Sequence, residues 1–423
     1  MRRFYPEAIK DLVFSLLSEV ANDTNTSAYV VGGFVRDYLL GIQNDDIDVV
    51  VEGSGIEFAK VFANKVNGKL SYYENYGTAM VRFGDQEVEF VGARKEMYER
   101  GSRKPIVEEG TLYDDISRRD FTINAMALSL NQDNYGELID YFNGFEDLGN
   151  KIIKTPLEPS ITFSDDPLRM FRAVRFLTKL PGFVLDPVTK DGIISNVERT
   201  NILTRERITG EIEKMLSYHN PGIGLRMLNE LGLWDIAFAG RCEYDDTYVQ
   251  CVCSVGKLQL RWFFIAVSGI DIGWFPEFTA AMRLPNDLAS YMVRVYQTYA
   301  DLIWLPFPDI SRVRHCLNMS GSEAPDAVLA VFQYQRVRGE YDESIVYDWM
   351  SYTTAMFCEN ERFADFKLPC NGREISEWSG LPEGKELGSL IELVKEEILS
   401  GRLGESRNSV YAYVRYLSTF KKK

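Results

Sequence analysis

The stretch VVGGFVRDYLLGIQNDDIDVV, residues 30–50, determines how the first part of the chain folds. A short run of β-branched residues ends in two glycines, which is typical of a strand that enters a turn. The residues VRDYLLG predict a short helix that ends at Gly41, and DIDVVVEG predicts a buried strand. Because side chains alternate along a strand, we expect Asp46 and Asp48 on the same face.

These two carboxylates repel each other unless water screens them or a divalent cation binds between them. Magnesium prefers hard oxygen ligands and commonly takes few carboxylates together with substrate phosphates. Gly32 and Gly33 would let backbone amides approach a phosphate, with the N-terminus of the following helix beside them. Arg36 is then a candidate triphosphate contact, and Asp37 could hold the loop. The alternative is a solvated strand edge that follows a glycine turn.

A third carboxylate is a candidate on the neighbouring strand. The residues TAMVRFGDQEVEFVGAR (78–94) predict a β-hairpin that turns at Gly84 and Asp85. Glu89 lies on the second strand of this hairpin, where it is either a catalytic carboxylate or an exposed hairpin residue. Further along the chain, FTINAMALSL (121–130) is an apolar segment that we expect to begin as a helix.

With 423 residues the chain is long enough for about two to four domains. From about Lys151 onward the hydrophobic pattern is helical. No apolar run approaches the ~20 residues of a membrane span. The N-terminal residues MRRFYPEAIKDLVFSLL predict an amphipathic helix in place of a signal peptide. We therefore expect a cytoplasmic protein without a membrane partner.

The net charge of −15 argues against nucleic acid as a partner, because phosphate contacts need lysine and arginine. Charge is unevenly distributed, however, with basic clusters at 94–104, 117–120 and 168–176. Six scattered cysteines and only two histidines offer poor spacing for a structural zinc site. We therefore expect no zinc, and free thiols in a reducing compartment.

Five segments, taken in order along the chain, resemble the motifs of class II tRNA nucleotidyltransferases. This family contains the CCA-adding enzymes and their bacterial poly(A) polymerase relatives, and it belongs to the DNA polymerase beta-like superfamily. The segments are GGFVRDYLLG…DDIDVVV, DDISRRDFTINAMA (114–127), DYFNGFEDLGNKII (140–153), DDPLRMFRAVRF (165–176) and TRERITGEIEKML (204–216).

The resemblance implies an α/β nucleotidyltransferase head with a mixed sheet and helices, followed by an all-α remainder. It implies four domains: a catalytic head over 1–145, a nucleotide-selecting neck over 146–217, a body over 218–325 and a tRNA-binding tail over 326–423. A fused phosphohydrolase with a His-Asp metal centre is excluded, because the chain has too few histidines.

By the same resemblance, Asp46 and Asp48 bind Mg²⁺ and Glu89 is the possible third catalytic carboxylate. This arrangement is typical of two-metal phosphoryl transfer with release of pyrophosphate. The RRD triplet would recognise the ribose, and Asp166 with Arg169 would imitate a Watson–Crick edge complementary to cytosine and adenine. The residues to which the resemblance assigns nucleotide binding are Gly32, Gly33, Arg36, Arg118, Arg119, Asp120, Asp166, Arg169, Arg172 and Arg175.

The function implied is template-independent addition of C, C and A to the tRNA 3′ end from CTP and ATP. A poly(A) polymerase, or an enzyme that adds only A or only CC, shares these motifs and stays open. A catalytically inactive RNA-binding relative is the remote alternative. Residues 94–115 predict a long polar loop. By the resemblance, the matching loop of CCA-adding enzymes helps the switch from C to A addition, and its full length here argues against an enzyme that adds C only. The sequence does not predict the oligomeric state. Candidate tRNA contacts are Arg226, Lys257, Arg261, Arg294, Arg312, Arg314, Lys385 and Lys395.

Overall fold

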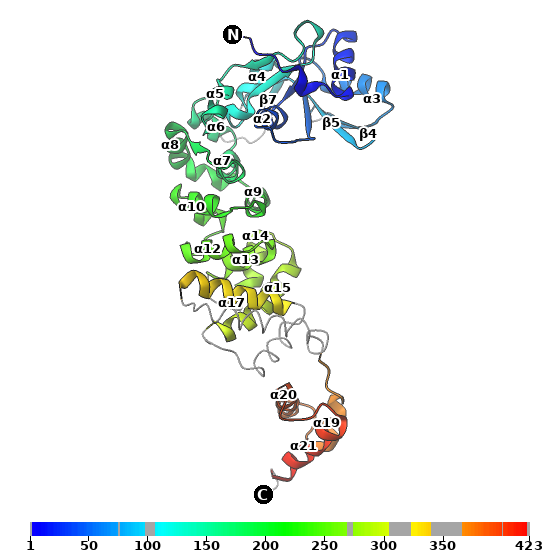
Figure 1. Ribbon diagram of the computed structural model, residues 1–423, viewed down its shortest axis with the longest axis vertical. Coiled ribbons are helices and arrows are strands. Elements are labelled where there is room, and N and C mark those ends of the chain that lie inside the picture. The colour runs from blue at the N-terminus through cyan, green and yellow to red at the C-terminus, as the bar shows by residue number, and fades with distance from the viewer. Residues whose placement is uncertain are drawn as a thin grey trace. The chain divides into compact units, whose positions relative to one another are not determined.

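The computed structural model describes residues 2–74, 77–97, 106–268, 274–303, 323–339, 366–399 and 401–420. The chain forms two compact units. The first contains residues 1–218 and 227–233, and the second contains 219–226 and 234–423. Figure 1 colours the chain from blue at the N-terminus to red at the C-terminus, and each unit is described by itself.

A seven-stranded mixed sheet forms the centre of the first unit, in the order β3-β4-β5-β2-β1-β8-β9. Strands β2 and β5 pair in parallel, whereas every other neighbouring pair in this sheet is antiparallel. The strands are β1 (Ala28–Val31), β2 (Ile47–Val51), β3 (Lys69–Tyr73), β4 (Thr78–Phe83), β5 (Gln86–Gly92), β8 (Met126–Ser129) and β9 (Leu138–Asp140).

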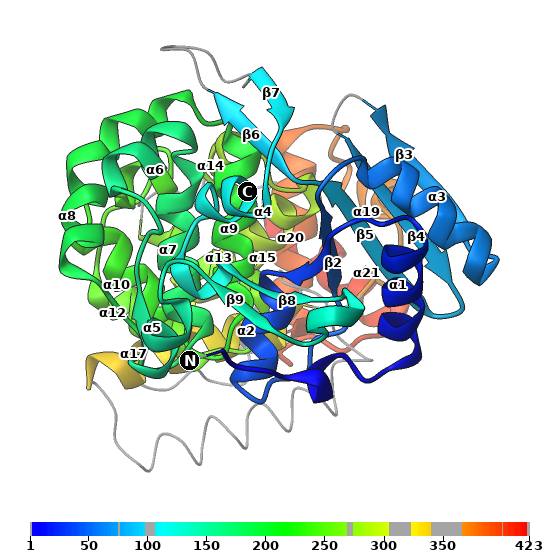
Figure 2. The ribbon, with the colours of Figure 1, turned by 90° about the horizontal axis from the view of Figure 1, so that it is seen from above.

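Two helices cover one part of this sheet, as Figure 2 shows for α1 (Leu12–Asp23) and α3 (Gly55–Val66) beside β3 to β5. Ser54 caps the N-terminus of helix α3, and its side chain accepts a hydrogen bond from the Glu57 amide. Phe62 of α3 packs against Phe90 of β5, and both side chains are fully buried. Helix α3 therefore closes the core on one face of the sheet. Alternate residues of β2 point to the opposite face.

Helices follow the sheet within the same unit. They are α2 (Gly33–Leu39), α4 (Leu112–Ser117), α5 (Gly144–Gly149), α6 (Pro159–Asp165), α7 (Leu168–Lys179), α8 (Pro187–Asn196) and α9 (Arg205–Ser217). Helix α7 packs against α9 and buries Met170, Phe171 and Val174. Two short pairs of strands complete the unit, β6 (Arg94–Met97) with β7 (Ile106–Glu109) and β10 (Ile152–Ile153) with β11 (Val184–Leu185).

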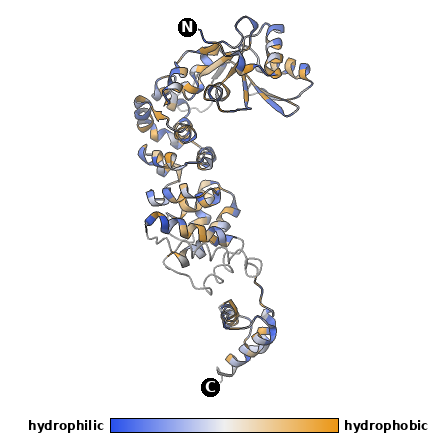
Figure 3. Cartoon of the chain, in the orientation of Figure 1, coloured by the Kyte–Doolittle hydropathy of each residue, from blue (hydrophilic) through white to orange (hydrophobic). Residues whose placement is uncertain are grey.

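The described elements of the second unit are helical. They include α11 (Trp234–Ala237), α12 (Asp246–Ser254), α13 (Leu258–Val267), α14 (Trp274–Met282), α15 (Asn286–Leu302), α17 (Ala324–Arg338), α19 (Gly372–Ser379), α20 (Lys385–Leu399) and α21 (Arg407–Phe420), and α10 (Gly222–Glu230) contributes residues to both units. The last three helices share a core of Ile375, Val394, Ile398, Val410 and Val414. Hydrophilic residues interrupt the hydrophobic ones along these helices (Figure 3). Among the described residues, no helix combines the length and the apolar character of a membrane span.

The mixed sheet and the helical remainder confirm the predicted fold class. The predicted hairpin is also confirmed, with Phe83 of β4 opposite Gln86 of β5. The division into four domains stays a prediction.

Three local predictions need correction. The segment 121–130 forms only one 3-10 turn at Thr122–Asn124 before it becomes strand β8, because β8 pairs with β1. The N-terminal α-helix begins at Leu12, after a separate 3-10 turn at Pro6–Ile9. Part of the predicted loop 94–115 is strand, since β6 and β7 pair, whereas residues 98–105 lie outside the described residues.

Candidate active site

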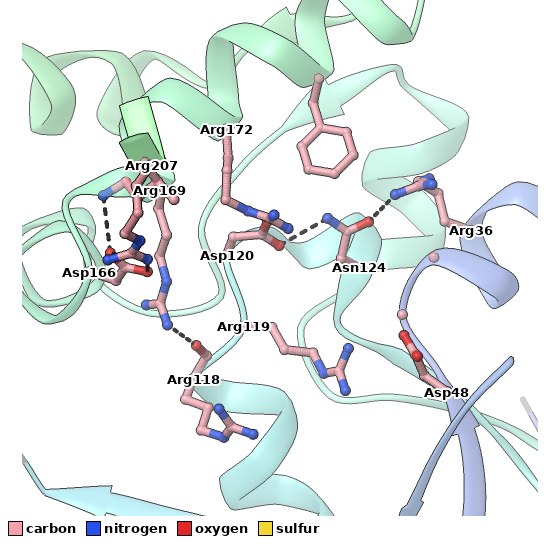
Figure 4. Close-up of a pocket in the computed structure, with 14 residues that line it drawn as sticks. Arg36, Asp48, Arg118, Arg119, Asp120, Asn124, Asp166, Arg169, Arg172 and Arg207 are labelled. Carbon is pink, nitrogen blue, oxygen red and sulfur yellow. Dashed lines mark hydrogen bonds and ion pairs between the residues drawn. The ribbon is translucent and has the colours of Figure 1, made fainter. Parts of the chain in front are cut away.

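The first unit contains a cleft of about 480 Å³ between its sheet and helices α7 and α9 (Figure 4). Most of the predicted site residues meet in this cleft, although they come from segments far apart in the chain. The lining residues are Gly32, Gly33, Arg36, Asp48, Arg118, Arg119, Asp120, Asn124, Asp166, Leu168, Arg169, Arg172, Phe176 and Arg207.

The paired glycines make room for an arginine at the edge of the cleft. Gly32 has φ +72° and ψ −123°, a conformation that residues with a Cβ rarely adopt. A Cβ on Gly32 would lie 2.6 Å from Nη1 of Arg119. The backbone conformation therefore requires glycine at this turn, and the missing Cβ leaves room for the end of the Arg119 side chain.

Asp115 holds the first two arginines of the RRD triplet. This carboxylate is fully buried and accepts hydrogen bonds from Nη2 of Arg118 at 2.5 Å and from Nη2 of Arg119 at 3.1 Å. Burial alone would raise the pKa of Asp115, but the guanidinium groups of Arg119 and Arg118 hold it below its ordinary value. Asp115 is thus a charged anchor beneath the cleft.

Asp120 joins the head to helix α7. Its Oδ1 accepts from the Phe121 amide at 2.8 Å and from Nδ2 of Asn124 at 2.9 Å. Its Oδ2 accepts from Nε and Nη2 of Arg172 at 2.8 and 2.7 Å. Burial opposes ionisation, yet Arg172 leaves the pKa of Asp120 below its ordinary value. A carboxylate has about four acceptor positions, so all are in use and the ribose contact stays a prediction.

Arg36 is held at the opposite side of the same network. Its Nη1 donates to Oδ1 of Asn124 at 2.6 Å, and its Nε donates to Oδ1 of Asp37 at 2.7 Å. The guanidinium carbon lies 5.1 Å from the centre of the Phe176 ring. Asn124 therefore connects Arg36 with Asp120, as the dashed lines in Figure 4 show.

The predicted base-reading pair lies at the start of α7. Asp166 accepts from the Leu168 amide at 3.2 Å and from Nη2 of Arg207 at 3.0 Å. Arg169 donates from Nη1 to the Thr162 carbonyl at 3.1 Å and from Nη2 to the Arg118 carbonyl. An acceptor and a donor thus stand on one turn of chain and line the cleft together (Figure 4).

The predicted metal-binding carboxylates lie at one end of β2. Asp48 lines the cleft and stands opposite Glu89 of β5 in the parallel register, whereas Asp46 precedes the strand. Loss of hydration raises the pKa of Asp48, Arg119 opposes this rise, and Asp46 adds to it. Loss of hydration and then Asp48 raise the pKa of Glu89. A divalent cation would relieve this accumulation of negative charge.

The described residues contain no ready-made group of three or more histidine, cysteine, aspartate or glutamate side chains that could hold a metal ion. Magnesium in phosphoryl-transfer sites commonly binds one or two carboxylates and takes its other ligands from substrate phosphates and water. The carboxylates near the end of β2 fit such an incomplete site, which a nucleotide would complete.

Arg175 is a correction to the predicted site. It does not line the cleft; it is buried, and its Nε donates to Oε2 of Glu211 at 2.5 Å while its Nη1 donates to the Tyr218 hydroxyl at 3.2 Å. Residues three apart on an α-helix are displaced by about 60° around the axis. Two such steps from Arg169 turn Arg175 away from the cleft and towards α9.

Four residues that line the cleft were missed by the sequence interpretation: Asn124, Leu168, Phe176 and Arg207. Arg207 lies in one of the five quoted motifs, but only the packing of α9 on α7 brings it to Asp166. Asp115 precedes Arg119 by four residues in another motif, which is a helical spacing for an ion pair. Asn124 carried no signal within its apolar surroundings.

The candidate tRNA contacts in the second unit differ in exposure. Arg261 is buried and donates to the Val255 carbonyl at 2.8 Å, so its prediction as a surface contact is wrong. Arg226 pairs with Asp246, Lys257 with Asp326 and Arg294 with Glu323. Lys385 is exposed and Lys395 half-buried, whereas Arg312 and Arg314 lie outside the described residues.

Comparison with known proteins agrees with this geometry. Residues 28–154 match the family described as "Poly A polymerase head domain", and residues 182–241 match "Probable RNA and SrmB- binding site of polymerase A". A CCA-adding enzyme of Bacillus velezensis is 36% identical over 283 residues, which cover 64% of this chain and 68% of the relative. The chain belongs to the tRNA nucleotidyltransferase and poly(A) polymerase family. Nucleotidyltransferases of this family generally use divalent metal ions.

Other relatives of this nucleotidyltransferase family differ in name and length. An A-adding tRNA nucleotidyltransferase of Geobacter sulfurreducens is 39% identical over 277 residues, which cover 64% of this chain but only 31% of the relative. The chain therefore spans about a third of that protein. A solved apo structure of a CCA-adding enzyme has a TM-score of 0.75 at 24% identity and covers 99% of both chains, which shows a shared fold.

Proposed function

We propose that this chain adds C, C and A to the 3′ end of tRNA from CTP and ATP and releases pyrophosphate. The observation that carries the proposal is one cleft that combines Asp48, the Asp166–Arg169 pair and arginines anchored on buried carboxylates. Membership of the nucleotidyltransferase family supports the reaction class. The name of the Bacillus velezensis relative supports the CCA product.

Selection of the base would rest on Asp166 and Arg169. The carboxylate accepts from the exocyclic amino group of cytosine or adenine, and the guanidinium donates to the neighbouring ring nitrogen. Guanine and uracil present the opposite pattern, so donors face donors and acceptors face acceptors. Each buried group left without a partner costs about 1–3 kcal/mol, which is sufficient for discrimination.

Binding of the triphosphate would rest on Arg36, Arg119 and Arg172. Asp37, Asp115 and Asp120 respectively hold these side chains in the cleft before the nucleotide arrives. Catalysis of phosphoryl transfer depends on positioning and on electrostatic stabilisation of the developing charge. Anchored cations serve both purposes, because they need little reorganisation when the substrate binds.

Asp46 and Asp48 would hold Mg²⁺, with Glu89 beside Asp48 on the adjacent strand. Bound divalent ions supply charge that lowers the pKa of the RNA 3′-hydroxyl and neutralises the leaving pyrophosphate. The chain's own residues orient the nucleotide against that end of β2. We further propose the division into head (1–145), neck (146–217), body (218–325) and tail (326–423), with the body and tail holding tRNA in the cytoplasm.

Addition of A alone is the second candidate. It is favoured by the name of the Geobacter sulfurreducens relative, which is an A-adding enzyme at 39% identity. Addition of CC alone and poly(A) synthesis use the same cleft and are further outcomes of the test below.

The test supplies one nucleoside triphosphate at a time to three RNAs: tRNA that lacks CCA, tRNA that ends in CC, and an unrelated RNA. We expect CTP to extend the first and ATP to extend the second, with no use of GTP or UTP. Extension by ATP without any use of CTP would identify an A-adding enzyme. Long A tails on the unrelated RNA would contradict tRNA-end addition, and no incorporation at all would contradict the proposal.

A further inference from the structure

The backbone of Asp46 is held by a side chain of the preceding loop and not by the hydrogen bonds of strand β2. The strand begins at Ile47, and Asp46 lies exposed just before it. The Asp46 amide donates to Oδ1 of Asn44 at 2.9 Å. The other end of the same side chain, Nδ2 of Asn44, donates to Oδ2 of Asp37 at 2.9 Å. One amide side chain thus links a predicted metal ligand to a buried carboxylate.

Asp37 is a rigid support. It is buried on helix α2, and its Oδ1 accepts from Nε and Nη2 of Arg36 at 2.7 and 2.6 Å. Its Oδ2 accepts from Asn44 and, at 3.4 Å, from Nζ of Lys179 at the end of α7. Asn44 also lies close to the glycine turn, since a Cβ on Gly33 would be 3.6 Å from its Nδ2.

We propose that Asn44 is a positioning residue that sets the place of Asp46 relative to Asp48 by tying the loop before β2 to Asp37. The inference deepens the proposed function and rests on it, because Asp46 is positioned here for metal binding. Loss of an outer hydrogen bond to a metal ligand commonly costs about 10–100-fold in metal affinity or activity. The Asn44 contact is to the backbone amide of Asp46 and not to its carboxylate, so we expect an effect at the lower end of this range.

The chemistry of the side chain makes the proposal specific. Asparagine offers an acceptor to the Asp46 amide and a donor to Asp37 at the same time. Serine at this position can still accept from the amide two residues on, as in a local turn, but it is too short to bridge to Asp37. Alanine offers neither contact. Comparison of Asn44→Ser with Asn44→Ala therefore separates a local turn from a tie to the buried carboxylate.

The experiment measures Mn²⁺ affinity by electron paramagnetic resonance on the full chain with and without ATP, against a control of ATP alone, because the phosphates of a nucleotide complete the site. It also measures kcat and KM for ATP on a tRNA that ends in CC. Variants are Asn44→Ala and Asn44→Ser, and the control is Gln43→Ala, an exposed neighbour in the same loop. We expect Mn²⁺ to bind about 10-fold more weakly to both Asn44 variants. The kcat should fall while KM for ATP stays unchanged, and a high Mg²⁺ concentration should restore part of kcat.

The outcomes are distinguishable. If the wild-type chain binds Mn²⁺ and Asn44→Ala binds it equally well, this inference is overturned and the proposed function is untouched. Full recovery in Asn44→Ser would overturn the tie to Asp37, because the local turn would then suffice. If the wild-type chain binds no Mn²⁺ even with ATP present, both the metal site of the proposed function and this inference are contradicted. A loss in Gln43→Ala equal to that in Asn44→Ala would also contradict a specific role.

Discussion

The ion pairs of the two units differ in which partner is buried. In the first unit, four arginines in and beside the cleft have buried acidic partners: Asp37, Asp115, Asp120 and Glu211. Asp166, the partner of Arg207, is half-buried. In the second unit, the pair of Arg226 with Asp246 lies at the surface, with side chains 47% and 45% exposed. The partner of Arg294, Glu323, is also reached by solvent.

Surface and buried ion pairs differ in what they contribute to stability and to the positioning of side chains. A surface ion pair contributes about 0–1 kcal/mol and weakens with salt. A buried carboxylate must keep its partner, because a charge left alone in the interior is costly. The arginines that pair with buried carboxylates are therefore fixed in place, as electrostatic catalysis requires, whereas Arg226 and Arg294 of the second unit pair with partners that solvent reaches.

The largest effect should follow from removal of a buried anchor. We expect Asp115→Ala to destabilise the first unit by about 3 kcal/mol and to lower nucleotide addition strongly, because Arg118 and Arg119 lose their common partner. Hydrogen exchange of peptides from residues 28–218 measures this loss. All six tryptophans lie at or beyond Trp234, so tryptophan fluorescence during urea unfolding follows the second unit separately.

The matched control is Asp246→Ala, which removes a surface partner of one arginine. It should lower the free energy of unfolding of the second unit, measured from the fluorescence transition, by about 1 kcal/mol or less. If the two substitutions lowered the free energy of unfolding equally, the distinction between buried and surface pairs would be contradicted.

The next effect concerns the choice of nucleotide. Asp166→Ala removes the proposed acceptor for the exocyclic amino group, so discrimination against uracil and guanine should fall by about 2 kcal/mol. Incorporation of each nucleotide, supplied singly, gives kcat/KM for the comparison. Retention of full selectivity for CTP and ATP would show that Asp166 does not read the base.

A smaller effect is expected from pH. The pKa values of Asp48 and Glu89 are raised, so these groups take up protons at a higher pH than ordinary carboxyls with pKa of about 4. Mn²⁺ affinity should therefore begin to fall above that pH as the solution is acidified. The pKa of Asp115 is lowered, so its stabilising charge persists until the pH falls below the unfolded value of about 3.9. Loss of the fold before loss of Mn²⁺ binding would contradict this order.

The smallest effect should come from Arg294→Ala in the second unit. Its pair with Glu323 at 3.0 Å is bidentate but open to solvent, so the loss should be about 1 kcal/mol at low salt and less at high salt. Urea unfolding at two salt concentrations measures it. A loss that is independent of salt would place this pair with the buried ones.

The sequence predicts contacts that depend on local pattern better than contacts that depend on packing. Strand β2, the hairpin of β4 and β5, and the position of Glu89 beside Asp48 follow from alternation and turn residues. Strand β8 did not, because its pairing with β1 overrides its helical tendency.

Side-chain partners were harder to predict for a physical reason. The direction of Arg175 depends on a rotation that accumulates along α7, and its partner Glu211 lies on another helix. Asn124 acts only through Arg36 and Asp120, which become its neighbours after folding. The chemistry of the cleft was thus visible in residue types, whereas the pairing of its arginines with particular carboxylates required the folded chain.

Asp48→Asn tests the central claim most directly, with Asp85→Asn in the exposed turn of the same sheet as the control. The variant keeps the shape of the side chain but removes the charge that would hold Mg²⁺. We expect it to abolish addition of nucleotides to tRNA without lowering the thermal unfolding temperature, because Asp48 is exposed and substitutions outside the packed core usually change stability little. An Asp48→Asn chain that extends tRNA at the wild-type rate would contradict the account.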